Sequence, residues 1–140
     1  MATEDRLAAA EAAIAELRRE VARLQDVEAI RILQRTYGFC MDKGLYDEVC
    51  DLFAEDGELH CMGGIWQGRE SVRRLYCGRL RKLFTGGVNG PAYGMRVEHW
   101  PSQDVIHVAP DGLTAQGRWR CTLMGAIHDS KPDKPEPLPR

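Results

Sequence analysis

Apolar residues in the first part of the chain recur at alternating steps of three and four, the spacing of one face of a helix. The repeat consists of Leu7, Ala10, Ile14, Leu17, Val21 and Leu24. Such a seam is typical of a coiled coil, but about three heptads make a marginal helix unless they pack against something. We predict an amphipathic helix over residues 1–25 that either covers the protein's own sheet or pairs with a second copy.

A second helical pattern follows, with a stripe that mixes apolar and polar side chains: Ile30, Leu33, Gln34, Tyr37 and Met41. Asp26 is a suitable N-cap, so we predict that a new helix covers residues 27–42. Lys43 and Gly44 are expected to end it, because glycine accepts the left-handed conformation that follows a last turn. Asp42 then lies in the last turn, where the helix dipole disfavours a carboxylate, and this placement suggests a functional role.

The next residues predict a short helix, a hairpin and a longer helix. The short helix has the apolar face Leu45, Val49, Leu52 and Phe53. Residues 58–62 and 65–67 alternate as strands around a turn at Gly63 and Gly64. The longer helix has an apolar face of Val72, Leu75, Tyr76, Leu80 and Leu83 and a basic face of Arg69, Arg73, Arg74, Arg79, Arg81 and Lys82. The basic face is either solvated or a site for an anionic ligand or nucleic acid, and its lack of aromatic residues disfavours nucleic acid.

Two long strands are predicted near the end of the sequence. Residues 95–101 and 105–108 belong to the first, with a bulge or bend expected between them. The turn at residues 110–112 leads into residues 113–123, in which small or apolar side chains alternate strictly with polar ones. Residues 127–140 are rich in proline, which lacks the amide of a ladder strand, so no strand is predicted there.

Length and charge describe an ordinary globular chain. It has 140 residues, of which 44% are apolar, and a net charge of −2. This is enough for one domain with a core, and it gives no general attraction to nucleic acid or membrane. The first residues contain neither a basic leader nor an apolar run of signal-peptide or membrane-span length, so we expect a cytoplasmic protein.

The five cysteines are Cys40, Cys50, Cys61, Cys77 and Cys121. Their number is odd, they are unclustered, and their neighbours are apolar, so we interpret them as reduced core residues. The alternative is a nucleophilic cysteine, which requires a base beside it that the sequence cannot place.

Three motifs occur in an order that resembles a known family. They are Tyr37-x-x-x-x-Asp42, then Tyr46-Asp47-x-x-x-x-Leu52-Phe53-Ala54-x-Asp56-Gly57, and finally Gly68-Arg69-Glu70-Ser71-Val72. Together they resemble the SnoaL-like branch of the nuclear transport factor two-like superfamily over residues 27–124. We interpret residues 26–126 as this domain, preceded by the helix at 1–25 and followed by the proline-rich segment at 127–140.

The resemblance implies an α+β fold in which a curved antiparallel sheet wraps round helices into a cone, or cystatin-like α+β barrel, with an apolar pocket. Family members normally continue with two more strands, whereas this pattern ends after the fourth. We therefore expect C-terminal strands to be missing. Either the polypeptide is a fragment, or another chain or the N-terminal helix completes the exposed edge.

The resemblance also implies a catalytic pair, Asp42 and His99, supported by Tyr37 and His60. In similar enzymes an aspartate at the helix end and a histidine on the long strand share the pocket, where the carboxylate orients the histidine as a general base. From the residues alone, a strand histidine such as His99 is more often a packed, hydrogen-bonded residue, and Asp42 is the cap of a turn. Flat walls for a substrate are expected from Tyr46, Trp66, Tyr93 and Trp119.

We therefore predict a cofactor-independent lyase, dehydratase or isomerase that moves a proton on a small aromatic or polycyclic substrate, lignin-derived aromatic dimers being one such class. The alternative is a non-catalytic binding or assembly module of the same fold. The sequence lacks the nucleophile elbow, the phosphate-binding loop and the dinucleotide fingerprint, and its histidines lack ligand-like spacing, so no cofactor or metal is expected. The expected partners are the substrate and further copies of the chain, most simply in a homodimer.

Overall fold

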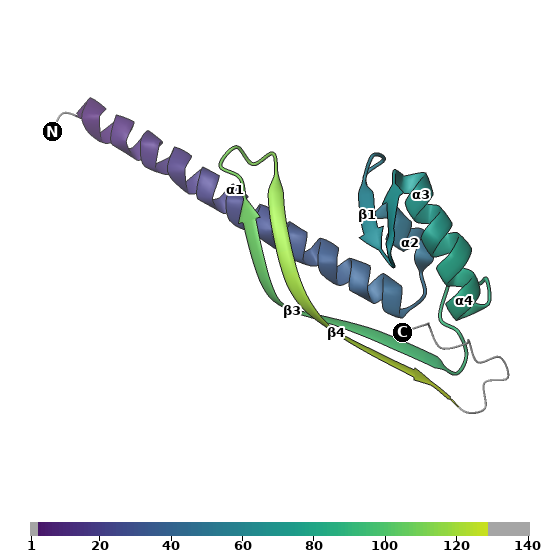
Figure 1. Ribbon diagram of the computed structural model, residues 1–140. Coiled ribbons are helices and arrows are strands. Elements are labelled where there is room, and N and C mark those ends of the chain that lie inside the picture. Colours follow the sequence, from purple (N-terminus) through teal and green to yellow (C-terminus); the bar gives the residue numbers. More distant parts are fainter. Residues whose placement is uncertain (1–2, 129–140) are drawn as a thin grey trace. The chain divides into compact units, whose positions relative to one another are not determined.

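The computed structural model describes residues 3–128 (Figure 1). The described residues form both helices and antiparallel strands, as expected of an α+β chain. Residues 3–32 and 103–119 form one compact unit, and residues 33–102 and 120–128 form a second. The candidate site lies entirely in the second unit.

The first helix, α1, runs without interruption over Thr3–Asp42. The predicted restart after Asp26 is therefore wrong: the sequence between the two patterns contains neither glycine nor proline, and an aspartate inside a helix costs only a few tenths of a kcal/mol. The seam residues from Leu7 to Leu24 stay largely exposed, with Leu17 65% and Ile14 49% accessible. No described helix is both long and apolar enough to cross a membrane.

The predicted end of α1 is confirmed at Gly44, whose φ of +62° is the left-handed conformation that favours glycine. The amide of Leu45 donates to the Cys40 carbonyl at 2.9 Å, which satisfies part of the helix end. The chain then enters α2, Tyr46–Asp51, as the apolar pattern predicts.

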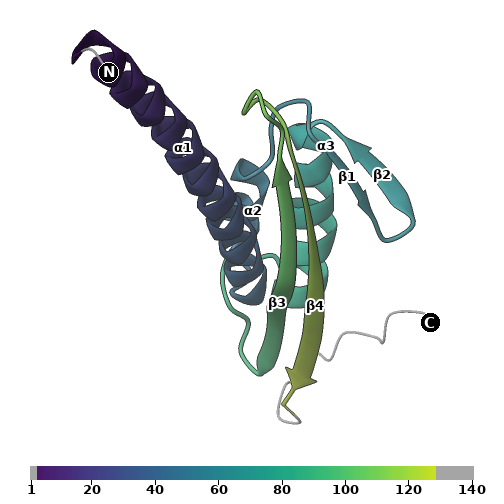
Figure 2. The same ribbon diagram turned by 90° about the vertical axis from the view of Figure 1, so that its left-hand side faces the viewer.

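Strands β1, Glu58–Cys61, and β2, Gly64–Gln67, form an antiparallel hairpin (Figure 2). Leu59 pairs with Trp66, and the turn consists of Met62 and Gly63, both with positive φ. Two positive φ values are the requirement of a two-residue hairpin turn that matches the strand twist. The turn lies one residue earlier than predicted.

One regular helix was predicted after the hairpin, but the structure has three consecutive segments. These are α3, Arg69–Arg73, the π-helix η1, Arg74–Leu80, and α4, Arg81–Thr85. A π-helical stretch of this length is uncommon and is often found at functional sites. The core of this unit lies between these segments, α2 and the end of α1, and its fully buried side chains are Val49, Cys50, Val72, Leu75 and Tyr76.

Part of the basic face of this region pairs with the protein's own acids. Arg73 binds Asp47 and Asp51, each at 3.1 Å, and Arg81 binds the other oxygen of Asp47 at 2.8 Å. The hydrogen bond from Arg81 is the largest cause that lowers the pKa of Asp47; burial opposes it, and the hydrogen bond from Cys77 and the charges of Arg81 and Arg73 add to it. Arg69 contacts Glu55 and donates to the Phe53 carbonyl. Part of the basic face is therefore neutralised by ion pairs with acidic residues of the same chain.

The two long strands are β3, Met95–Val108, and β4, Ala115–Ile127, which pair as a second two-stranded sheet. The predicted interruption of β3 corresponds to Gln103, whose φ of +51° bends the strand without ending it. The predicted turn is confirmed by the Gly112 amide, which donates to the Ala109 carbonyl at 2.9 Å. Within residues 3–128 the two sheets are separate, so the predicted cone stays a prediction. The segment 129–140 lies outside the described residues.

The prediction that all five cysteines are core residues is only partly right. Cys40 and Cys50 are buried, Cys61 and Cys77 are half-buried, and all five are free thiols. Cys121 is exposed, because it lies on a strand whose side chains are accessible on both faces. Alternation alone does not distinguish a covered strand from an uncovered one.

Candidate functional site

The predicted pair Asp42 and His99 comes together at the end of α1. One carboxylate oxygen of Asp42, Oδ1, lies 2.7 Å from the ring Nδ1 of His99 and 2.8 Å from its main-chain nitrogen. The two side chains are largely shielded, with 17% of Asp42 and 21% of His99 accessible. The main chain and the ring of His99 thus both donate hydrogen bonds to the Asp42 carboxylate, which compensates for its unfavourable position at the end of the helix dipole.

This contact determines which ring nitrogen of His99 is available. An ionised carboxylate only accepts hydrogen bonds, so Nδ1 carries the proton and donates it to Asp42. In the neutral ring Nε2 is then unprotonated and can accept a proton. The contact also fixes the orientation of the ring, as an aspartate does for the histidine of a catalytic triad.

A small cavity of about 30 Å³ lies beside Asp42. Its walls are mostly apolar and come from the end of α1, α2, α4, the loop before β3 and β3 itself: Met41, Asp42, Gly44, Tyr46, Phe84, Thr85, Pro91, Ala92, Met95 and Val97. Val97 lies two residues before His99 and so shares its face of the strand, as predicted. The volume suits about one water molecule and no aromatic ring.

Tyr37 belongs to a cluster of aromatic side chains next to the site. Its hydroxyl lies 2.7 Å from the hydroxyl of Tyr76, whose ring also packs on Tyr46 and Phe53. Burial is the main cause that raises the pKa of both Tyr37 and Tyr76 above the ordinary value for tyrosine. The two phenols are therefore neutral, hydrogen-bonded groups at the edge of the core.

The other predicted site residues are not gathered round Asp42. His60 is exposed on β1, where its imidazole contacts Glu58. Trp66 packs against the core and its indole nitrogen donates to the Cys61 carbonyl at 3.4 Å. Tyr93 is 80% exposed, and Trp119 belongs to the other compact unit. Of the four residues predicted as aromatic walls, Tyr46 alone lines the cavity.

Several wall residues were missed by sequence reasoning. Met95 could have been found, because it has the same parity on β3 as Val97 and His99. Phe84, Pro91 and Ala92 lie in the glycine-rich stretch 84–94, whose composition is typical of a loop beside a pocket, but this stretch has no period that would indicate which of its side chains form the wall. Within residues 3–128, no three His, Cys, Asp or Glu side chains gather as a metal site requires.

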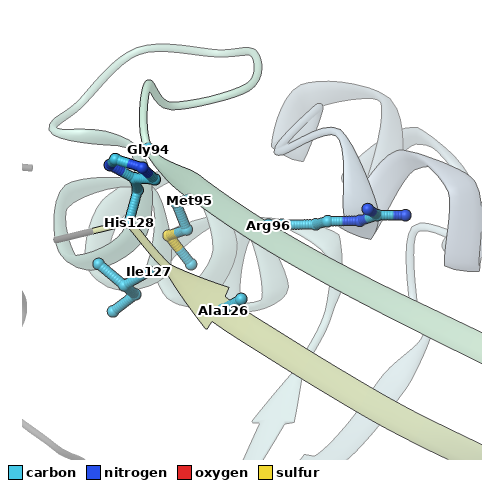
Figure 3. A pocket seen from close by; sticks show the side chains of 6 residues that line it. All are labelled: Gly94, Met95, Arg96, Ala126, Ile127 and His128. Carbon is cyan, nitrogen blue, oxygen red and sulfur yellow. The ribbon is translucent and has the colours of Figure 1, made fainter. Parts of the chain in front are cut away.

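A second hollow of about 560 Å³ is wide open to solvent at the end of the β3–β4 hairpin (Figure 3). The side chains of Met95, Ile127 and His128 gather there, while Arg96 extends away from them. The main-chain nitrogen of His128 donates to the Gly94 carbonyl at 2.7 Å, which continues the pairing of β3 and β4 at the end opposite the turn. Met95 is common to the walls of both hollows.

Comparison with known proteins identifies the family. The sequence model of the SnoaL-like domain matches residues 22–137, which is most of the chain. A comparison with curated proteins finds no match. Because the family match spans the helix end, α2, the hairpin and both long strands, the chain belongs to the SnoaL-like domain family of the nuclear transport factor two-like superfamily.

Proposed function

We propose that the protein catalyses proton transfer on a small organic substrate, with His99 as the general base and Asp42 as the residue that orients it. The observation that carries the proposal is the 2.7 Å contact between Asp42 Oδ1 and His99 Nδ1. Elimination and isomerisation are the reaction types that such a base serves without a cofactor.

In the proposed reaction, Nε2 of His99 removes a proton from a carbon or oxygen of the substrate. The imidazolium that forms carries its charge next to the Asp42 carboxylate, which stabilises it. The same nitrogen then returns the proton to another atom of the substrate or to a leaving group. A positioned group of this kind contributes about two to four orders of magnitude to the rate.

The apolar walls beside Asp42 favour a substrate with little charge, such as an aromatic or polycyclic compound. The cavity of about 30 Å³ is too small for such a molecule, so binding must move wall residues. The loop at residues 86–94 is the part of the wall with the fewest main-chain constraints, because it lies outside the helices and strands. We propose that substrate entry displaces Pro91 and Ala92.

The second candidate is a non-catalytic module that assembles with other copies through its N-terminal helix. Two observations favour it: the cavity is small, and the apolar seam from Leu7 to Leu24 is exposed. The two candidates are distinguished by whether His99 is needed for any chemical change in a ligand.

The test is exchange of acidic C–H protons with deuterated water for a panel of hydroxylated aromatic and polycyclic compounds. We expect the native chain to catalyse exchange for some members, and the His99→Ala variant to lose it. The matched control is His107→Ala, which removes an exposed histidine from the same strand. Equal exchange by the native chain and His99→Ala would overturn the proposed base, and no exchange with any compound would favour the assembly module.

A further inference from the structure

Two cysteines far apart in the sequence meet in the second unit. The Sγ atoms of Cys50, in α2, and Cys77, in η1, lie 3.6 Å apart. Among the described residues, the other three thiols make no such contact with one another. A disulfide needs about 2.05 Å between the sulfurs, so closure requires a movement of about 1.5 Å.

The pair has one covered member and one that solvent can reach. Cys50 is fully buried, whereas Cys77 is half-buried. The Cys77 thiol contacts Asp47 Oδ1 at 3.3 Å and the Tyr46 carbonyl at 3.5 Å, and a guanidinium nitrogen of Arg73 lies 4.0 Å away. Arg81 completes this polar surround through its bond to Asp47.

We propose that Cys50 and Cys77 form a reversible disulfide when the protein meets a peroxide. The residue that reacts first is Cys77, because its sulfur is the more accessible of the two. Its position in a π-helical stretch, followed by Gly78 with no atom near its side-chain position, gives the backbone room for the required movement.

The chemistry balances in two steps. The sulfur of Cys77 attacks one oxygen of hydrogen peroxide, which breaks the O–O bond and gives a sulfenic acid and water. The sulfur of Cys50 then displaces the hydroxyl group from Cys77, forming the S–S bond and a second water. Peroxide is reduced and two thiols are oxidised. An added dithiol reverses the reaction by exchange.

Burial and the neighbouring charges determine the rate of the first step. Burial raises the pKa of both thiols, that of Cys50 to about 12, so both are protonated near neutral pH. Asp47 also raises the pKa of Cys77, whereas Cys50 and Arg81 lower it. Thiolate is the reactive form, so oxidation is expected to accelerate with rising pH and in the Asp47→Asn variant.

The experiment treats the full chain with about one equivalent of hydrogen peroxide, alkylates the remaining thiols, and maps the peptides by mass spectrometry. We expect two of the five cysteines to be protected from alkylation and a linked peptide pair that contains Cys50 and Cys77. Addition of a dithiol should restore all five. The oxidised chain should also melt at a higher temperature, since the link constrains the unfolded chain.

Three variants serve as controls. Cys50→Ser and Cys77→Ser should abolish the protected pair, whereas Cys121→Ser should keep it, because Cys121 lies exposed on β4. If a core variant fails to fold, the peptide map of the native chain still decides. Links that involve Cys121 instead, or further oxidation of Cys77 without a link to Cys50, would overturn the proposal.

Discussion

Asp42 holds His99 through a single carboxylate oxygen, which accepts hydrogen bonds from both the main-chain amide and the ring of the histidine. The ring and the strand that carries it are thereby tied to the same point at the end of α1. Replacement of His99 removes the proposed base, whereas replacement of Asp42 removes the group that orients it. Measurements on the two kinds of variant can therefore distinguish these roles.

Removal of the base itself should have the larger effect. His99→Ala is expected to lower turnover of an identified substrate by about two to four orders of magnitude. The fold should persist, because the change removes no large apolar side chain from the core. Turnover and a melting curve for the same preparation check the prediction, and near-native turnover by the folded variant would contradict it.

Asp42→Asn should reduce turnover while leaving His99 in place. The amide keeps the shape but loses the charge that stabilises the imidazolium, and its NH₂ group can select the wrong tautomer of the ring. The measurement is the rate for Asp42→Asn and for Asp42→Glu, which retains the charge. If the asparagine variant is as fast as the native protein, Asp42 has no orienting role.

The hydroxyl bond between Tyr37 and Tyr76 should contribute to stability. The family resemblance implied that Tyr37 supports the pair Asp42 and His99; in the structure its hydroxyl has a protein partner, the hydroxyl of Tyr76. Tyr37→Phe leaves the buried Tyr76 hydroxyl without this bond and should cost about 1–3 kcal/mol of unfolding free energy. Denaturant unfolding measures it, with Tyr93→Phe, an exposed position, as the control that should change little.

Two glycines at the end of α1 should respond in opposite ways to alanine. A methyl group at Gly38 would meet only His99 atoms at 3.7 and 3.8 Å, so Gly38→Ala should stabilise the helix by about 0.5–1 kcal/mol. At Gly44 it would lie 2.7 Å from the Gly90 carbonyl oxygen, and φ is positive. Gly44→Ala should therefore destabilise by at least about 1 kcal/mol, as judged by unfolding of both variants.

Asp47 should make stability depend on pH. The hydrogen bond from Arg81 is the largest cause of its lowered pKa, so the folded state favours the ionised form. Its contribution is present above the ordinary aspartate pKa of about 3.9 and is lost as pH falls through the lowered value. Asp47→Asn should melt below the native chain near neutral pH, and the difference should shrink in acid. The comparison is Asp56→Asn, which removes an exposed carboxylate elsewhere in the chain.

The exposed seam should support self-association. Ile14 and Val21 take one core position of the heptad, and Leu17 and Leu24 take the other. This combination favours a parallel coiled coil of two helices. We expect the native chain to be a dimer by light scattering at micromolar concentration. Ile14→Glu should shift it to monomer, whereas Ala12→Glu, on the opposite face, should not. A native chain that is monomeric under these conditions would contradict the prediction.

The parts of the structure that sequence reasoning found are those with a local signal. Gly44 marks the helix end through its required φ, and the parity of β3 places Val97 and His99 on one face. The approach of Asp42 to His99 came from the family resemblance, since 57 residues separate them and no periodicity connects them. The meeting of Cys50 with Cys77 had no signal at all, because it depends on how α2 packs against η1.

The π-helical stretch at Arg74–Leu80 also determines which changes of length this chain can accept. Its hydrogen bonds span five residues rather than four, so a chain one residue shorter there could continue as an ordinary α-helix. The wider turn already accommodates the extra residue, so the side chains beyond the deletion would keep nearly their present directions round the helix axis. Arg81 would stay with Asp47, and Phe84 would stay in the cavity wall. A relative that lacks this one residue should therefore keep both the partner of Asp47 and the wall of the site.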